Sequence, residues 1–179
     1  MRLDEYSAYD ALGLAELVRA GEVTSAELVG LAIQSAELLN PTLRAVVRTY
    51  PERIESAPAT PAGVFAGVPT LVKDLFHGEV GWECANGSRL CEGWHVAYAD
   101  EFTERLHRAG LVPMGRSATS EFGILGTTET IAVGRTCSPW DTGSRPPRAE
   151  SSASRPAAGG SPGDPVSGSR CWAGPRTSS

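Results

Sequence analysis

Apolar residues near the start of the chain recur at the three- and four-residue spacing of one helix face. Leu14, Leu17 and Val18 follow this spacing and predict a first short helix within residues 10–20. Gly21 comes directly after it and is a typical helix stop signal, because glycine tolerates the left-handed backbone found at helix ends.

A second and longer helix is predicted directly after the first. Thr24 is followed three residues later by Glu27, which is the spacing of a capping box. A single apolar stripe then continues along one predicted face, made of Leu28, Leu31, Ala32, Ser35, Leu38 and Leu39. We expect the helix to end at Asn40 and Pro41, because proline has no N–H to donate to the helix.

Short apolar runs predict three buried strands. Residues 45–47 form the first run, residues 68–72 the second and residues 111–114 the third. Residues 51–63 between the first two are rich in Pro and Ala and predict a surface connection.

A third helix is predicted between the last two strands. Asp100 can cap it, and Gly110 ends it. Its expected apolar face consists of Phe102, Leu106 and Ala109. Helices that alternate with short strands indicate an α/β fold, a mixed and largely parallel sheet wrapped by helices.

Composition changes abruptly after Thr142. Residues 143–179 contain no Leu, Ile, Phe, Tyr, Met or Lys and consist mostly of Ser, Gly, Pro, Arg and Ala. Such a segment has too few apolar side chains to build a core, so a disordered tail is expected. The sequence therefore predicts a folded part at 1–142 and a low-complexity tail at 143–179.

Charge excludes several classes of partner. Residues 1–142 carry 11 Lys and Arg against 19 Asp and Glu, and an acidic body repels a phosphate backbone, so no nucleic-acid partner is expected. The first 17 residues include four carboxylates and no long apolar run, which predicts neither a signal peptide nor a membrane span. A cytoplasmic protein is the expectation.

Few residues suggest chemistry by their spacing alone. Lys73 and Asp74 follow the second predicted strand, and without further information they indicate a solvated ion pair. His77, His95 and His107 share no spacing with one another or with an acid, so no metal site and no Ser/His/Asp triad is expected. The four cysteines show no C-x-x-C pair and predict ordinary reduced thiols.

Three stretches together resemble the amidase-signature family. They are G-V-P-T-L-V-K-D at residues 67–74, A-D-E-F-T-E-R-L-H-R-A-G-L-V-P-M-G-R-S at residues 99–117, and the run from Ser120 through T-T-E at 127–129 to S-P-W at 138–140. Their order and spacing match the family over about residues 60 to 142, and three motifs in register are far more specific than one. The resemblance implies the N-terminal part of the family's fold, followed by the tail.

The resemblance implies a catalytic triad of serine, cis-serine and lysine, in which Lys73 is the lysine. A lysine must be neutral to act as a base, which implies that Lys73 is buried. It would accept a proton from a bridging serine, which in turn activates a nucleophilic serine beside an oxyanion hole. The mechanism implies no metal and no cofactor, and its substrate is a small-molecule amide.

Both serine-bearing segments of the family are missing from this sequence. Ser151 and Ser152 lack the flanking glycines that such a segment needs, and Gly160-Ser161 is followed by Pro162 instead of Ile-Arg. The sequence therefore indicates an amidase truncated before both serines and inactive alone, with a marginal or insoluble product expected. Two alternatives remain: a non-catalytic pseudoenzyme or binding module with a disordered tail, and an A-type subunit of a tRNA-dependent amidotransferase.

The tail itself has the properties of an out-of-frame translation of a GC-rich gene. If the codons from Asp164 are read one nucleotide later, the genetic code permits I-R-S-P-A at 164–168 and G-L-V at 172–174. That reading resembles the family's segment after the nucleophilic serine. The shifted codon before that Ile cannot encode the serine, so more than one nucleotide change is implied.

Overall fold

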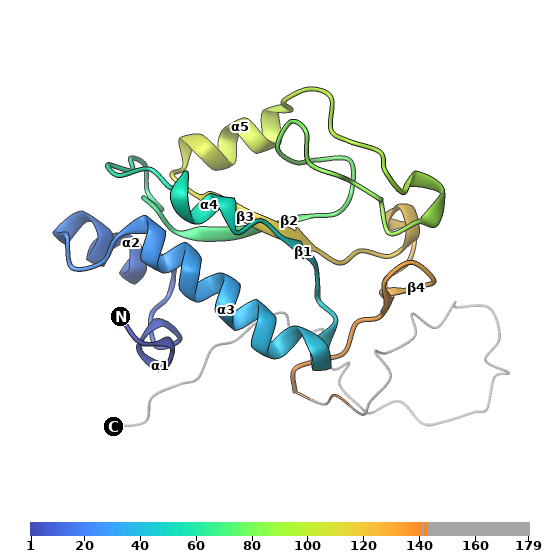
Figure 1. Ribbon diagram of the computed structural model, residues 1–179, viewed down its shortest axis with the longest axis horizontal. Helices are drawn as coiled ribbons and strands as arrows, with labels where there is room; N and C mark the ends of the chain where they lie inside the picture. The colour runs from blue at the N-terminus through green and yellow to red at the C-terminus, as the bar shows by residue number, and fades with distance from the viewer. Residues whose placement is uncertain (141, 143–179) are drawn as a thin grey trace, which may run out of the picture. The chain divides into compact units, whose positions relative to one another are not determined.

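The computed structural model describes residues 1–140 and 142, and the predicted tail at 143–179 lies outside the described residues. A three-stranded sheet forms the centre of the described part (Figure 1). Its helices are α1 (Leu3–Tyr6), α2 (Ala11–Ala20), α3 (Ser25–Leu43), α4 (Glu52–Glu55) and α5 (Glu101–Arg108), with 3-10 turns η1 (Arg89–Cys91) and η2 (Glu121–Gly123). Its strands are β1 (Val46–Thr49), β2 (Pro69–Lys73) and β3 (Val112–Ser117), and a separate small hairpin pairs β4 (Glu129–Thr130) with β5 (Gly134–Arg135).

The sheet has the order β1-β3-β2 and is mixed. β2 runs parallel to β3, with Pro69 opposite Val112 and Lys73 opposite Ser117. β1 runs antiparallel to β3. The α/β class and the mixed sheet are confirmed, although the described strands form one parallel and one antiparallel pair where a largely parallel sheet was expected.

Helices α2 and α3 begin close to the positions that the sequence predicts. The Asp10 side chain accepts a hydrogen bond from the Gly13 N–H at the start of α2, and Gly21 ends that helix with a φ of 74°. At the start of α3, Thr24 and Glu27 form the capping box expected from their spacing. Both helix starts are therefore encoded locally.

The predicted end of α3, at Asn40 and Pro41, is too early, because the helix continues to Leu43. Pro41 lies inside the helix, which continues to Leu43 and ends at Arg44 in the left-handed conformation. Proline in the last turn removes one backbone hydrogen bond and leaves the others in place. The Asn40 side chain then fixes the exit of the chain, because it donates to the Val46 carbonyl at 2.7 Å and accepts from the Val46 N–H at 2.8 Å.

The predicted stripe of α3 is confirmed in its first part, where Leu28 and Ala32 are buried, and is wrong at its end. Val29 and Ile33 are buried and pack against Val112 and Met114 of β3. Leu38 and Leu39, which were expected in the stripe, are 62% and 56% exposed. The last turns of α3 still lie beside the sheet, because Leu39 and Leu43 line an open pocket of about 220 Å³ together with Leu71 of β2 and Met114 of β3.

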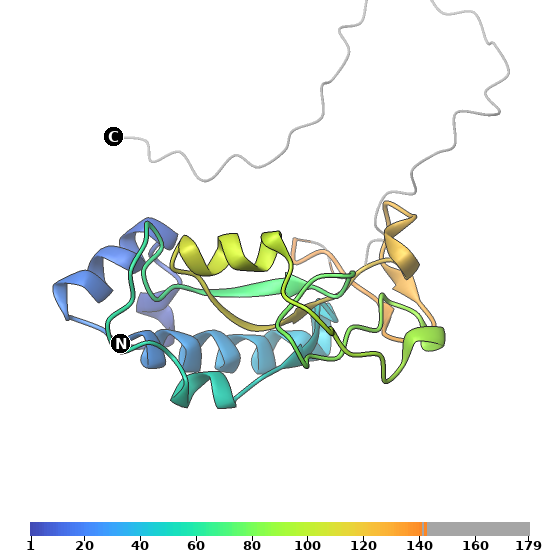
Figure 2. The ribbon, with the colours of Figure 1, turned by 90° about the horizontal axis from the view of Figure 1, so that it is seen from above.

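Helices lie on both sides of the sheet, and Figure 2 shows α3 and α5 on opposite sides of the strands. A first core cluster joins α2 and α3 to the residues before β2, through Leu14, Leu28 and Val68. The second cluster is the one between α3 and β3. These layers hold β2 and β3 side by side, which places the ends of both strands together.

Two predicted segments differ from the structure between β1 and β3. Residues 52–55, within the predicted surface connection, form helix α4, and its Ile54 packs on the second core cluster. Asp100 caps α5 as predicted and accepts from the Thr103 N–H at 2.8 Å. Two residues of the expected face of α5, Leu106 and Ala109, are half-buried, whereas Phe102 is 49% exposed and Thr103 is the buried residue of the helix.

Candidate active site

Lys73 is the last residue of β2 and the only lysine in the sequence. It stands opposite Ser117 at the end of the parallel pair, and the next residue, Asp74, donates its N–H to the Ser117 carbonyl at 2.9 Å. Residues at the carboxyl ends of parallel strands are a common location for functional side chains. The structure therefore places the predicted catalytic residue at an edge suited to chemistry.

The Lys73 side chain is exposed, which corrects the expectation that it would be buried. Side chains alternate along a strand, so Val72 and Asp74 turn inward, each 1% exposed, while Lys73 turns outward. Within the described part of the chain, no hydrogen bond or ion pair reaches its ammonium group. Lys73 and Asp74 do not form the solvated ion pair that their positions would indicate without the family motif, because the two side chains leave the backbone on opposite faces.

Asp74 organises the loop that follows β2. Its carboxylate accepts backbone hydrogen bonds from Ala85 at 3.1 Å and from Gly87 at 3.4 Å. The Arg116 Nε lies 3.9 Å from the same carboxylate, and both side chains are almost completely buried. Through these contacts Asp74 holds the end of β2 and the turn that follows it.

Arg116 is the buried cation beneath the end of β2, and sequence reasoning missed it. Its Nη1 donates to the Lys73 carbonyl at 3.2 Å and also to the His77 carbonyl. A single arginine within the otherwise uncharged strand V-P-M-G-R-S was the available signal, since a charged side chain in a buried strand requires buried partners.

Two aromatic rings lie near the buried Arg116 and Asp74 side chains. Trp82 stacks on Tyr50 with ring centroids 3.8 Å apart, and the Arg116 guanidinium lies 5.9 Å from the Trp82 ring. Burial raises the pKa of the Tyr50 phenol, although the nearby Arg116 acts in the opposite direction. Trp82 therefore packs in the core, whereas Trp94 is 44% exposed.

The turn after Lys73 is held tightly by the backbone and by Asn86. Leu75 donates its N–H to the Lys73 carbonyl at 2.8 Å, and His77 donates to the Leu75 carbonyl at 2.7 Å. The buried Asn86 side chain accepts from the Phe76 N–H at 2.8 Å. The backbone of Lys73 is therefore fixed from several directions, while its side chain remains free.

Two histidines have acidic partners that their spacing did not reveal. His77 Nδ1 lies 3.2 Å from Asp100, and His107 Nε2 lies 2.7 Å from Glu79. Both pairs join α5 to the segment after β2, and only the tertiary structure brings them together. In the described residues, no group of three or more His, Cys, Asp and Glu side chains gathers as a metal site.

Other candidate nucleophiles and acids near the site have structural roles. Burial raises the pKa of the Cys84 thiol, which is fully buried, so this thiol is poorly suited to act as a thiolate nucleophile. Glu121 lies in the short helix η2 and accepts a hydrogen bond from the Ser88 hydroxyl at 2.6 Å. It ties η2 to the preceding loop.

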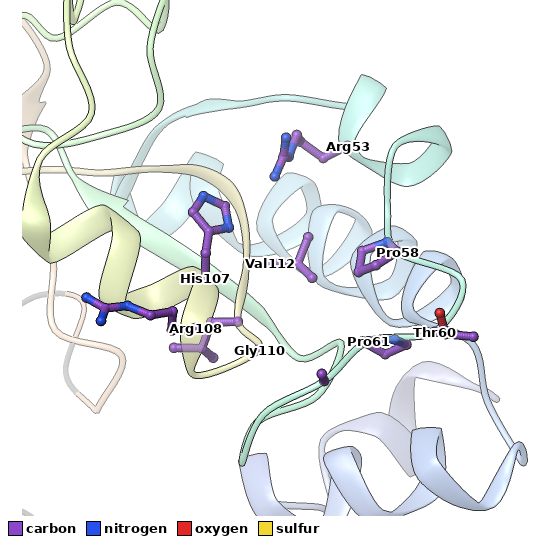
Figure 3. Close-up of a pocket in the computed structure, with 10 residues that line it drawn as sticks. Arg53, Pro58, Thr60, Pro61, His107, Arg108, Gly110 and Val112 are labelled. Carbon is purple, nitrogen blue, oxygen red and sulfur yellow. The ribbon is translucent and has the colours of Figure 1, made fainter.

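A pocket of about 300 Å³ lies at the opposite end of the strands (Figure 3). Arg53 and His107 come toward each other across it, and Val112 lies below Arg53 in this view. Both side chains also face Glu79, whose carboxylate is 3.7 Å from Arg53 and 2.7 Å from His107. Since Val112 pairs with Pro69 at the start of β2, this pocket is about 13 Å from the Lys73 backbone along the strand and does not belong to that site.

The three motifs of the sequence come together around the end of β2. The first is β2 itself, the second supplies α5 and β3, and the third follows β3 through η2 to the small hairpin. Gly67 of the first motif has a φ of 78°, and a Cβ there would lie 2.0 Å from the Ser25 hydroxyl of α3, so glycine is required where β2 approaches α3. The arrangement presents one free amine on a rigid strand end.

Comparisons with known proteins agree with these motifs. A model of the amidase family matches residues 26–147. The 6-aminohexanoate-cyclic-dimer hydrolase of Paenarthrobacter ureafaciens is 35% identical over 137 residues, which cover 75% of this chain and 28% of that enzyme. The A-type subunit of the glutamyl-tRNA(Gln) amidotransferase from Mycobacterium leprae (strain TN) is 32% identical over 149 residues, which cover 78% of this chain and 30% of that protein.

Solved structures give the same result for the fold. A 6-aminohexanoate cyclic dimer hydrolase structure superimposes with a TM-score of 0.72 at 33% identity, over 80% of this chain and 29% of that one. The chain therefore spans less than a third of the length of the relatives that it matches. In the described part, no helix is long and apolar enough to cross a membrane. Because the family model covers well over half of its residues, the chain belongs to the amidase-signature family.

Proposed function

We propose that this chain supplies the lysine-bearing part of an active site that hydrolyses carbon–nitrogen amide bonds in small molecules, with Lys73 as the base. The observation that carries the proposal is the placement of the only lysine, exposed and without a partner in the described residues, at the end of a strand held rigidly by buried groups. A base must present its nitrogen to the reacting proton, and an amine already engaged in an ion pair would not do so. A base must also be neutral, so the proposal requires that other segments of the complete active site cover the Lys73 amine, because burial favours the neutral form of an amine.

The described residues provide no serine for the remaining two members of the family's triad. Lys73 stands opposite Ser117, but the Ser117 N–H and carbonyl belong to the sheet, and the family's two serine segments have no counterpart in the sequence. We therefore expect no turnover of aryl amides by the chain alone. The relatives named as hydrolases support an amide as the substrate class.

A graft tests the proposal. Residues 1–142 replace the corresponding part of the Paenarthrobacter ureafaciens hydrolase, and hydrolysis of the 6-aminohexanoate cyclic dimer and of a simple aryl amide is measured. Lys73→Ala should lower kcat by at least about 100-fold, which is the lower end of the contribution of a general base. Arg105→Ala, in an exposed pair with Glu101 on α5, is the matched control and should leave kcat within about twofold.

Two outcomes would contradict the proposal. One is a folded graft whose activity survives Lys73→Ala, and the other is a graft that folds but never hydrolyses an amide, which would favour the binding-module alternative. If the long graft does not fold, a shorter exchange of residues 67–117 keeps the same test. These residues contain β2, α5 and β3 and all the contacts that hold the end of β2, apart from Tyr50.

An A-type amidotransferase subunit is the second candidate, because the Mycobacterium leprae protein is 32% identical over a similar stretch. The two functions differ in partners rather than in the role of Lys73. Co-purification of this chain with other amidotransferase subunits from its own host would favour the second candidate. Recovery of the chain without them favours a stand-alone amidase.

A further inference from the structure

We propose that Arg116 is a positioning residue for Lys73: it fixes the backbone from which the lysine side chain projects. The inference rests on the proposed role of Lys73 as a base. Arg116 does not reach a substrate, because it is 1% exposed and lies beneath the strand end. It acts through the carbonyl groups of β2 and of the turn that follows.

The contacts of Arg116 surround the lysine on the backbone side. Its Nη1 bridges the carbonyls of Lys73 and His77, the two ends of the turn, and the same guanidinium faces the Asp74 carboxylate. The Asp74 carboxylate in turn accepts hydrogen bonds from the N–H groups of Ala85 and Gly87. One buried ion pair therefore joins the strand end, the turn and the returning loop.

The surroundings of the guanidinium are shaped to receive it. Gly78 has a φ of 142°, and a Cβ at this position would lie 2.5 Å from Arg116 Nη2, so only glycine leaves room for the side chain. The Arg116 guanidinium also lies over the buried Trp82 ring, 5.9 Å from the ring centroid. A buried charge is expensive to desolvate, and an apolar side chain of similar size would often be as stable. The carbonyls that Arg116 holds explain why an arginine occupies this position.

Lys73 depends on this support because nothing holds its side chain directly. Its flexible four-carbon stem leaves the backbone with no partner in the described residues, so the position of the strand end sets the region that the amine can reach. A displacement of about 1 Å in a catalytic group can cost about 100-fold in rate. Release of the two carbonyls would therefore matter to a reaction at Nζ even when the fold survives.

The test compares Arg116→Met with Arg53→Met in the full chain at low micromolar concentration. Arg53 is a matched control, because it also lies over Trp82, at 6.0 Å, and also donates to a backbone carbonyl, that of Pro113 at 3.0 Å. It does not contact the end of β2. Hydrogen–deuterium exchange of residues 74–78 should accelerate at least tenfold in Arg116→Met and stay within twofold in Arg53→Met. Arg116→Lys, which keeps one charged donor, should fall between wild type and Arg116→Met.

A second readout observes the lysine itself. Selective carbon-13 and nitrogen-15 labelling of lysine gives one residue to follow, because the sequence contains no other lysine. The Lys73 Cα and N–H signals should shift toward unfolded values in Arg116→Met and remain in place in Arg53→Met. In the graft, Arg116→Met should lower kcat at least tenfold with KM within twofold, which a general loss of stability would not produce at a temperature where both variants are folded.

The inference and the proposed function can fail separately. Equal exchange in the two methionine variants overturns the positioning role, whatever Lys73→Ala does to the graft. If Arg116→Met does not fold, hydrogen–deuterium exchange is measured in the wild-type chain instead. Exchange at residues 74–78 that is as fast as exchange in the exposed connection at 57–63 would show that nothing holds the turn, and would overturn the inference. Activity that survives Lys73→Ala overturns the catalytic role and leaves the exchange result unaffected.

Discussion

Lys73 and Asp74 are neighbours in the chain with opposite environments, and this contrast defines the site at the scale of single residues. One side chain is exposed and unpartnered in the described residues, and the other is buried against Arg116 and two backbone N–H groups. Strand alternation alone separates them. Substitutions at these two positions should therefore have very different effects on stability.

Lys73→Ala should change the free energy of unfolding by no more than about 0.5 kcal/mol, as is usual for exposed side chains without special contacts. Asp74→Ala should cost about 3 kcal/mol or more, because it leaves the Arg116 charge buried without its carboxylate. Urea unfolding of both variants measures the difference. A large loss for Lys73→Ala would show a structural role that the described contacts do not contain.

Gly78 tests the space around the Arg116 guanidinium. Gly78→Ala should destabilise the fold by about 2 to 4 kcal/mol, because the new Cβ would displace a buried charged group. Gly81→Ala is the control: Gly81 also has a positive φ, of 84°, but a Cβ there would meet nothing within 4 Å. It should cost only the backbone penalty of about 1 to 2 kcal/mol. Equal losses in thermal unfolding would argue against a close fit at Gly78.

At the scale of elements, α5 is attached to the site by its cap as well as by its packing. The Asp100 carboxylate accepts from the Thr103 N–H at one oxygen and contacts His77 with the other. Partial burial acts to raise the pKa of Asp100, but the hydrogen bonds from Thr103 and His77 outweigh it, and the pKa is lowered. The cap therefore links the start of α5 to the turn after Lys73.

This lowered pKa gives a pH dependence with a definite sign. A carboxyl whose pKa is lower in the folded state stabilises the fold above its unfolded pKa of about 3.9, and that stability is lost as the pH falls through the folded value. Asp100→Asn keeps an oxygen for the cap but loses the charge, so it should be less stable than wild type by about 0.5 to 1 kcal/mol at neutral pH. The difference should shrink below about pH 4.

Asp10→Asn is the control for this prediction, because Asp10 caps α2 through the Gly13 N–H at 2.8 Å without a histidine beside it. Urea unfolding between pH 3 and 7 compares the two variants. A gap between wild type and Asp100→Asn that stays constant over this range would contradict a role for the Asp100 charge.

At the scale of the whole molecule, many large apolar side chains in the described part remain exposed. Those at least half exposed between β2 and the end of the small hairpin are Phe76, Val80, Leu90, Tyr98, Ile124, Leu125 and Ile131. β2 is also an edge strand of the described sheet. Exposed apolar groups and open strand edges promote association.

We therefore expect the full chain to be monomeric only at low micromolar concentration and to associate as the concentration rises. Size-exclusion chromatography over a dilution series, together with binding of an apolar dye, measures this. The graft, in which the remainder of the hydrolase accompanies residues 1–142, should bind much less dye. A full chain that stays monodisperse and protease-resistant at high concentration would contradict the expectation.

The origin of residues 143–179, which lie outside the described residues, is tested by the gene. The shifted reading frame beyond codon 164 should continue for well over a hundred codons with amidase-like sequence and without a stop. Stop codons soon after codon 164 would show that the tail is native to this protein. The family match ends at residue 147, close to the predicted boundary at 142.

Local signals in the sequence determined where several elements begin and which residue stands at the end of β2. Asp10, Thr24 and Asp100 each cap a helix through their own side chains, and such bonds depend only on neighbours in the chain. The run before Lys73 predicted a buried strand, and the structure has one there. The motifs around it predicted the family, which the comparisons confirmed.

Tertiary structure alone decided which faces are buried and which charges meet. Periodicity placed the first part of the apolar stripe of α3, but it could not show which later positions are covered, and Leu38 and Leu39 remain exposed. The contact between Arg116 and Asp74 joins residues 42 positions apart, and the outward direction of Lys73 follows from the register of β2 on β3. Spacing in sequence carries no information about such pairs, since only the packing of the strands brings them together.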